Sequence, residues 1–362
     1  MPSNPQMIDP DQAWQRIMEH LSTLPPESVA RREAAGRVLA EKLVATVDVP
    51  ALDVSAMDGF AVGGNCQPGD AFRIQGTIAA GDPPGLHLGA GAAVRIMTGA
   101  PVPLGTDRVI PVELTRTVDP DTVEMLSVES PGSHIRLRGE VLGQGADLLA
   151  PGTPLTPGAL GLLATHGHEA VMVYRRPRVA VLATGDEVVP PEVEPKPGQL
   201  RDSHTDFLLA AGRSVRLDFE SLGISPDSRE EMRARITRGI DFDILLIGGG
   251  VSMGEFDFVE DILTELGCEI MVDAVSIQPG KPLVVAHHPN GLVFGLPGNP
   301  ASVMVGFWLF VRPALRRLQG ISDGFWSGAI VGELEGRLPG AKGRDRFLSA
   351  IVRVEDGRLK VR

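Results

Sequence analysis

The sequence has few cysteines, few aromatic residues and no excess of positive charge. Of its 362 residues only two are cysteine, Cys66 and Cys268, and one is tyrosine. Two isolated thiols build neither a disulfide framework nor a cysteine-based metal site, which suits a reducing cytoplasm. The 46 Asp and Glu residues outnumber the 34 Lys and Arg residues, so the formal net charge is −12. Nucleic-acid-binding proteins usually present a basic surface, and we therefore expect no nucleic-acid partner.

Long apolar runs are also missing. The longest, residues 301–311, is shorter than the roughly 20 residues that cross a bilayer, so we predict a buried core helix there. Residues 1–11 contain no basic segment followed by an apolar one, and we expect no signal peptide. Together these features predict a cytoplasmic protein without a membrane partner.

Glycine and proline, in contrast, are abundant, with 43 and 30 residues spread along the chain. They indicate many turns in a chain long enough for several domains. Apolar periodicity predicts helices over residues 10–22, 28–44 and 157–166 and a strand over 170–174. Residues 50–146 are predicted to form a β-rich domain, with strands at 60–62, 72–77, 93–97, 108–111 and 122–127.

From residue 177 onward, strand-like and helix-like segments alternate. Strands are expected at 178–183, 217–222, 243–247, 283–286 and 292–295, and helices at 203–211, 256–266 and 301–316. Ser225-Pro226-Asp227 reads as the start of a further helix. This alternation predicts a doubly wound, mostly parallel α/β sheet. Beyond residue 321, strand-like runs at 329–334 and 347–354 suffice for part of a small β domain.

Three glycine-rich turns follow apolar strands of the predicted sheet. Glycine lets backbone N–H groups approach an anion, and the carboxyl ends of parallel strands are where such sheets bind ligands. The turns therefore favour a phosphorylated or anionic ligand, although each is also compatible with a simple tight turn. The candidate binding residues in them are Thr184, Gly185, Gly248, Gly249, Gly250, Ser252, Pro297, Gly298, Asn299 and Pro300.

Charged residues stand beside these turns. Glu187, Asp227 and Asp257 could hold Mg²⁺, which prefers carboxylate oxygens and bridges to phosphates. Asp227 could equally be the acidic start of its helix. Pro279, Gly280 and Pro282 fix the backbone around Lys281, so its ammonium group would be well placed to bind an oxyanion. Alternatively, Lys281 is a solvated lysine in a surface turn. In the β-rich segment, sharp turns surround Asp58 and Thr98, and the residues alone do not assign them a role.

Two glycine motifs would indicate other functions. Gly250-Val251-Ser252-Met253-Gly254 fits the G-x-S-x-G nucleophile elbow, and Asp273, His287 and His288 could complete a serine hydrolase triad. The histidines lie in a probable hairpin, where turn chemistry explains them as well. The glycine spacing is wrong for dinucleotide binding, and a Walker A motif is absent.

Taken together, these strings resemble the MoeA family, which includes the E domains of gephyrin. The matching pieces are residues 55–60, 95–103, 135–140, 183–187, 227, 248–257, 279–282 and 296–300. The resemblance runs from about residue 10 to about residue 350. It implies an elongated linker domain (1–49 and 147–176), a β-rich domain (50–146), a molybdopterin-binding domain like that of MogA (177–320) and a small C-terminal β-barrel domain (321–362) that looks incomplete.

The resemblance also implies an activity, a molybdopterin molybdenumtransferase. In that reaction adenylylated molybdopterin and molybdate give molybdenum cofactor and AMP, with Mg²⁺, in a homodimer that a MogA-like protein could supply with substrate. Asp58, Glu187, Asp227 and Asp257 would be the acids of a cleft formed by two subunits, to which Thr98 also belongs. Lys281 and Arg136 would offset anionic charge, with Lys281 near molybdate. The glycine-rich turns would cradle the pterin phosphate.

Several positions depart from the family pattern. Val141 and Gln278 stand where Asp and Lys are usual, Ala274 where some members have a second lysine, and Ser349 where arginine is common. Most of these changes concern charge expected around molybdate. The alternative is therefore a non-catalytic paralogue or scaffold that binds a molybdopterin-type ligand or a protein partner.

Overall fold

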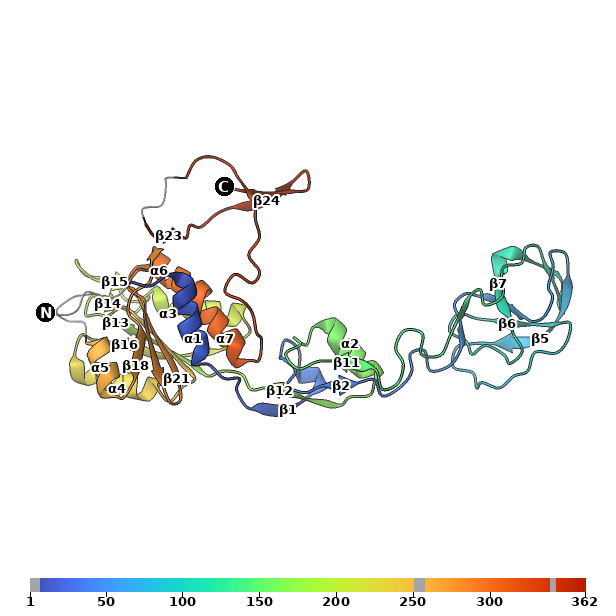
Figure 1. Cartoon of the computed structure of the whole chain (residues 1–362), viewed down its shortest axis with the longest axis horizontal. Coiled ribbons are helices and arrows are strands. Elements are labelled where there is room, and N and C mark those ends of the chain that lie inside the picture. Colours follow the sequence, from blue (N-terminus) through green and yellow to red (C-terminus); the bar gives the residue numbers. More distant parts are fainter. Residues whose placement is uncertain (1–6, 251–257, 339–342) are drawn as a thin grey trace. The chain divides into compact units, whose positions relative to one another are not determined.

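The computed structural model describes residues 7–250, 258–338 and 343–362, and Figure 1 labels its helices and strands. The chain divides into two compact units. The first comprises Met1–Glu41, Pro151–Leu160 and Ala170–Arg362, and the second comprises Lys42–Ala150 and Gly161–Glu169. This division does not test the four expected domains, whose bounds stay a prediction.

A six-stranded sheet forms the centre of the first unit. Its strand order is β16-β13-β17-β21-β20-β18. The pairs from β16 to β21 are parallel, and the two pairs that involve β20 are antiparallel. In the order given, the strands are Phe219–Ser225, Val179–Thr184, Ile244–Gly248, Gly291–Leu296, Val284–His288 and Glu269–Val272. Every residue of β13 and β17 is buried, as expected for central strands covered on both faces. The predicted α/β fold class is confirmed.

Alternate residues of β13 enter different cores. Val179 and Val181 pack in one apolar cluster with residues of α1, α3, α6 and α7, whereas Ala180 and Leu182 pack in another with residues of α4 and α5. Because successive side chains of a strand point to opposite faces, helices cover both sides of the sheet. The helices are α1 (Pro10–Glu19), α3 (His204–Ser214), α4 (Arg229–Gly239), α5 (Val259–Glu265), α6 (Pro300–Gly306), a π-helix (Phe307–Val311) and α7 (Arg312–Leu318).

The second unit is built on another six-stranded sheet, of order β7-β4-β6-β5-β9-β8. Phe60 and Val62 of β4 contribute to one apolar cluster and Ala61 to another, so both faces are packed. The strands are Arg108–Pro111, Gly59–Val62, Ala92–Ile96, Ala71–Ile78, Thr122–Met125 and Thr115–Asp119 in that order. All five strands predicted in this segment are present.

Short elements complete the chain. The two-stranded pairs are β1–β12, β2–β11, β3–β10, β14–β15 and β19–β23, and β22, β25 and β24 form a three-stranded sheet near the C-terminus. Their bounds are β1 Pro26–Ala30, β2 Leu43–Val44, β3 Val54–Ser55, β10 Ile135–Arg136, β11 Asp147–Leu149, β12 Ala170–Tyr174, β14 Val188–Val189, β15 Leu200–Arg201, β19 Ile277–Gln278, β22 Glu333–Leu334, β23 Asp345–Arg346, β24 Val352–Glu355 and β25 Arg358–Val361, with α2 at Pro157–Thr165 and 3-10 turns at Arg31–Glu33 and Val112–Leu114.

The helix predicted over residues 28–44 is wrong. This segment contains β1, a 3-10 turn and β2, and Gly36 has a positive φ of 71°. Its backbone bonds to distant segments instead: the Leu39 N–H donates to Thr153 O and the Ala40 N–H to Met172 O. Non-local pairing therefore overrides an apolar spacing that suits a helix.

The helix start predicted at Ser225-Pro226-Asp227 is also wrong. Helix α4 begins at Arg229 after an N-cap at Ser228, whereas Ser225 ends β16. Asp227 consequently lies in the turn between strand and helix, at the edge of the sheet where the predicted binding turns also lie.

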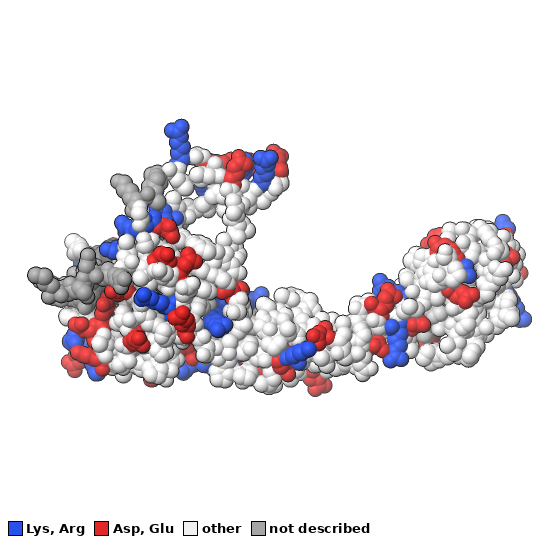
Figure 2. Space-filling model, in the orientation of Figure 1, with Lys and Arg blue, Asp and Glu red and all other residues white. Residues whose placement is uncertain are grey.

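On the face that Figure 2 draws, Lys and Arg side chains are interspersed with Asp and Glu side chains. Within the described ranges, no helix has both the length and the apolar character needed to cross a membrane.

Candidate active site

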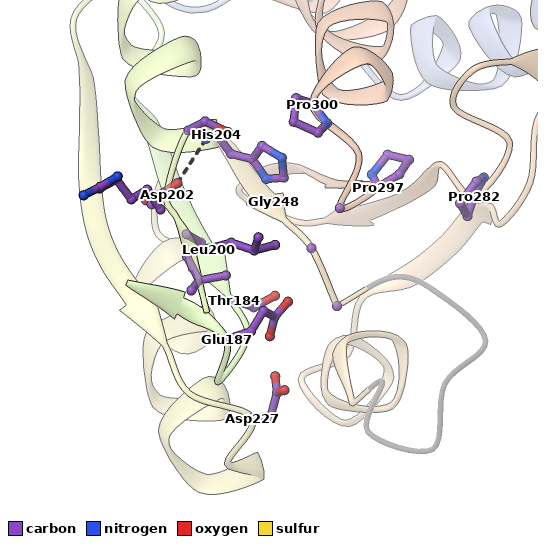
Figure 3. Close-up of a pocket in the computed structure, with 18 residues that line it drawn as sticks. Thr184, Glu187, Leu200, Asp202, His204, Asp227, Gly248, Pro282, Pro297 and Pro300 are labelled. Carbon is purple, nitrogen blue, oxygen red and sulfur yellow. Dashed lines mark hydrogen bonds between the residues drawn. The ribbon is translucent and has the colours of Figure 1, made fainter. Parts of the chain in front are cut away.

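The carboxyl ends of β13, β17 and β21 enclose a cavity of about 710 Å³. Most of the binding residues predicted for the three glycine-rich turns line it, as the close-up in Figure 3 illustrates. They are Thr184, Gly185, Gly248, Gly249, Gly250, Pro297, Gly298 and Pro300, and the predicted acids Glu187 and Asp227 line the cavity as well. Parallel neighbours in the sheet end at the same edge, which is why turns separated by more than a hundred residues meet here.

Two of these turns require glycine. Gly185 has a φ of 129°, and a Cβ placed on it would lie 2.6 Å from the Glu187 carboxylate. A Cβ on Gly249, whose φ is 98°, would lie 2.9 Å from Thr184 Oγ1 and 3.0 Å from the Thr184 carbonyl oxygen. Glycine thus lets the Glu187 carboxylate lie over one turn and lets the other turn close over Thr184.

Thr184 brings a polar atom into this wall. Its side chain is only 4% exposed, and among the described residues its hydroxyl has no hydrogen-bond partner. A buried hydroxyl without a partner costs free energy, and such groups cluster at functional sites.

Glu187 and Asp227 form an acidic edge of the cavity, and Asp186, which lines a neighbouring pocket, bonds to Asp227. The Asp227 N–H donates to the Asp186 carboxylate at 3.0 Å, and the Asp186 N–H donates to the Asp227 carboxylate at 3.4 Å. Burial raises the pKa of Asp227, and the nearby charges of Asp186 and Glu187 raise it further against the opposing hydrogen bond from Asp186. Crowded carboxylates of this kind are relieved by a cation.

Comparison with known proteins identifies the architecture. Residues 8–167 match the family model of the MoeA N-terminal region (domain I and II), and residues 180–317 match that of a probable molybdopterin binding domain. A molybdopterin molybdenumtransferase from Bacillus subtilis is 34% identical over 97% of this chain and 84% of its own length. The chain belongs to the MoeA family. The predicted resemblance is confirmed.

Other relatives agree with this assignment. A molybdopterin molybdenumtransferase from Nostoc is 38% identical over 72% of this chain, and the match spans 61% of the length of that relative. A solved MoeA structure from Pyrococcus horikoshii superposes with a TM-score of 0.83 and 25% identity, over 98% of this chain and 90% of that one. A second structure from that organism has a TM-score of 0.73 and 31% identity, over 87% of this chain and 81% of that one.

Family membership weakens the hydrolase hypothesis, and so does the geometry. His287 and His288 end β20 and, as predicted, enter a hairpin to β21, where His288 pairs with Gly291. Gly291 begins β21, whereas Leu296 at its other end precedes Pro297 of the cavity. The two histidines therefore lie at the opposite end of the sheet from the cavity, about 17 Å away for a six-residue strand. Ser252 lies outside the described residues.

Sequence reasoning missed the other wall of the cavity, which β15 and the start of α3 supply through Leu200, Arg201, Asp202, Ser203 and His204. The buried Asp202 carboxylate accepts the N–H groups of His204 and Thr205, both at 3.0 Å, and so caps α3 (Figure 3). An Asp-Ser pair before a helical pattern is a recognisable capping signal. That signal does not reveal that the helix starts against the turns of β17 and β21.

The remaining predicted residues have diverse surroundings. Asn299 caps α6 by accepting the Ala301 N–H at 2.9 Å. Lys281 is exposed and adjoins Pro282, which lines the cavity. Asp257 lies outside the described residues. Of the positions that depart from the family pattern, Ala274 is buried, while Val141, Gln278 and Ser349 are exposed.

Three predicted residues belong to the second unit. The Asp58 carboxylate accepts the Thr98 N–H at 2.7 Å and the Thr98 hydroxyl at 2.8 Å. These bonds from Thr98, the backbone one first, lower the pKa of Asp58, and the charge of Arg95 lowers it further. Asp58 and Thr98 thus form a fixed, ionised pair on an exposed turn. Arg136, in β10 and paired with β3, is exposed as well.

Proposed function

We propose that this chain transfers molybdenum to molybdopterin, as the names of its relatives suggest, and that the substrate is adenylylated molybdopterin and AMP is released, as the family resemblance implies. The observation that carries the proposal is the cavity itself. Three glycine-bearing turns, a buried hydroxyl without a partner among the described residues and an acidic edge line one space of about 710 Å³, a size suited to a nucleotide-like ligand.

The acidic edge fits Mg²⁺. Glu187 and Asp227 both line the cavity, and burial, followed by the nearby charges of Asp186 and Glu187, raises the pKa of Asp227. Within the described ranges no three His, Cys, Asp or Glu residues are arranged to hold a metal. Magnesium nevertheless keeps most of its waters and is often bound by one or two carboxylates together with substrate phosphates. In this proposal Glu187, Asp227 and Asp257 would hold Mg²⁺, and the ion would supply positive charge to offset that of the pyrophosphate.

The other cavity residues position the ligand. Gly248, Gly249 and Gly250 allow the backbone to approach phosphate oxygens, and Thr184, whose hydroxyl has no partner in the described part of the chain, lines the same space. Cleavage of a phosphoanhydride needs charge neutralisation and positioning more than a covalent nucleophile. Lys281, exposed beside the cavity, would attract the molybdate substrate, and Arg136 would offset anionic charge.

Four further points belong to the proposal and rest on the family resemblance. They are the homodimer, the contribution of Asp58 and Thr98 to the reaction, delivery of substrate by a MogA-like protein, and a cytoplasmic location. The competing idea is a non-catalytic scaffold, which the departures Gln278 and Ser349 would favour if they abolish molybdate binding.

The experiment that separates these functions uses the purified full-length protein with adenylylated molybdopterin, Mg²⁺ and molybdate. A transferase releases AMP and yields a cofactor that activates a cofactor-free molybdoenzyme. A scaffold binds the adenylylated ligand but leaves it intact. Labelling by a fluorophosphonate at Ser252 would support the hydrolase instead.

A further inference from the structure

His204 stands at the end of the cavity away from Glu187 and Asp227, next to Asp202. Glu187 and Asp227 follow β13 and β16, whereas His204 lies beside Gly248 and Gly298, which end β17 and follow β21. The strand order β16-β13-β17-β21 therefore separates the acidic edge from the histidine by the width of the cavity. Figure 3 has His204 and Asp227 at opposite ends of the view, with Thr184 between them.

The His204 ring is held by its surroundings. A Cβ on Gly248 would lie only 3.1 Å from its Nδ1, so the imidazole occupies space that the glycine leaves free. Burial lowers the pKa of His204, against opposing effects of the Asp202 charge and of a hydrogen bond with the Gly298 backbone. A neutral imidazole has one unprotonated nitrogen, which accepts hydrogen bonds.

An apolar groove adjoins this end of the cavity. The groove has a volume of about 480 Å³, and Phe207, Val303, Met304 and Phe347 contribute to its walls. It shares Ser203, His204 and Pro300 with the cavity, so the two spaces meet at the histidine. The surroundings of His204 thus favour a flat, weakly polar group, whereas the acidic edge with a bound cation favours phosphate.

We infer that His204 accepts a hydrogen bond from a planar nitrogen heterocycle of the ligand and so fixes the direction in which the ligand lies. The heterocycle lies toward β17 and β21, and the phosphates lie toward β13 and β16. The inference rests on the proposed function, because adenylylated molybdopterin carries two such heterocycles, pterin and adenine. Both present N–H donors, and a bare ring nitrogen accepts from them while it repels an anion.

Nitrogen NMR of the histidine rings tests this in the intact protein. The full-length chain, labelled with ¹⁵N-histidine, is titrated with 6-hydroxymethylpterin, adenosine or magnesium pyrophosphate. We expect one of the two heterocycles to shift the unprotonated nitrogen of His204, which identifies the ring that it binds, while pyrophosphate leaves this nitrogen unchanged. A response to pyrophosphate alone, or to none of the three probes at millimolar concentration, overturns the inference.

Two substitutions give a second measurement. His204→Leu removes the acceptor and should weaken binding of the effective heterocycle about tenfold, the loss expected for one neutral hydrogen bond. His204→Asn keeps an acceptor and should restore most of the affinity. The control is His87→Leu, because His87 is exposed on the second unit. If the wild type releases AMP but His204→Leu binds both heterocycles as tightly as the wild type does, the inference is wrong and the proposed function stands. If heterocycle binding depends on His204 while AMP is never released, the proposed function fails instead.

Discussion

Asp186 and Asp227 hold each other in place across the edge of the sheet. Each backbone N–H donates to the carboxylate of the other residue, at 3.0 Å for Asp227 and 3.4 Å for Asp186. The turn after β13 is thereby joined to the turn after β16, and two negative charges are fixed close to Glu187. The arrangement is unfavourable by itself and favourable with a cation, so it links the stability of this edge to metal binding.

Asp227→Asn should stabilise the protein when Mg²⁺ is absent. Asparagine keeps a hydrogen-bond acceptor and removes a charge repelled by its neighbours, a gain of about 0.5 kcal/mol for one like-charge contact. Because the folded state raises the pKa of Asp227, the wild-type free energy of unfolding falls as pH rises from the ordinary aspartate pKa through the raised one. Thermal unfolding from pH 4 to pH 8, with and without Mg²⁺, measures both effects. We expect the Mg²⁺-dependent rise in Tm to shrink in the variant.

The control for that experiment is Asp218→Asn, since Asp218 is exposed and does not line the cavity. It should leave the Mg²⁺ response unchanged. An Asp227→Asn protein that Mg²⁺ stabilises as strongly as the wild type would remove Asp227 from the cation site.

Thr184→Val should separate stability from binding. Valine has nearly the shape of threonine and removes a buried hydroxyl that has no partner within the residues that the structure describes, so the ligand-free protein should gain up to about 1 kcal/mol in its free energy of unfolding. Affinity for adenylylated molybdopterin should fall about tenfold, because the ligand loses one hydrogen bond. Denaturant unfolding and calorimetric titration check the two halves. Lower stability with unchanged affinity would mean that the hydroxyl serves the fold alone.

Gly249→Ala should impair the cavity more than the backbone strain alone explains. Gly198 offers a matched control, because its φ of 92° is close to the 98° of Gly249 and open space surrounds its missing Cβ. Gly198→Ala should cost about 1 kcal/mol of stability through strain only. In Gly249→Ala the new Cβ also meets Thr184, so we expect a larger loss of stability and at least tenfold weaker ligand binding. Equal effects of the two substitutions would argue against a specific role of the Gly249 turn.

Asp243→Asn should weaken the attachment of β17 to the segment after β12. The buried Asp243 carboxylate accepts both Arg175 Nη atoms, at 2.8 and 2.9 Å, and the Arg178 N–H at 2.6 Å. Burial alone would raise its pKa, but the bonds from Arg175 and Arg178 outweigh burial and lower it. The contribution to stability is therefore present above the ordinary aspartate pKa and is lost as pH falls through the lowered value. We expect a loss of about 2 kcal/mol at pH 7 by denaturant unfolding, since Arg175 is partly exposed. A loss as large at pH 2 as at pH 7 would contradict this account.

The sequence predicted the half of the cavity that is encoded locally. Each of the turns at Gly185, Gly249 and Gly298 follows an apolar strand, and strands of a parallel sheet end at a common edge, so their meeting could be inferred without coordinates. His204 could not be inferred in the same way. Its role depends on α3 starting against two turns that follow it by 44 and 94 residues, and no local pattern records that contact.

The error over residues 28–44 has the same origin. Their apolar spacing fits a helix, yet the backbone of Leu39 and Ala40 pairs with residues 153 and 172. Pairing partners more than a hundred residues away are invisible to periodicity. Gly36, whose φ is positive, is a local turn signal within this segment and argues against a continuous helix.

The most direct test of the account is the Mg²⁺ dependence of AMP release by Glu187→Gln. The carboxylate of Glu187 lies over Gly185 at the cavity, and the substitution changes its charge with almost no change in shape. We predict that half-saturation by Mg²⁺ moves at least tenfold higher and that the rate at low Mg²⁺ falls by at least the same factor, while the protein remains folded. A variant that releases AMP at the wild-type rate with the wild-type Mg²⁺ requirement would contradict the assignment of this cavity as the active site.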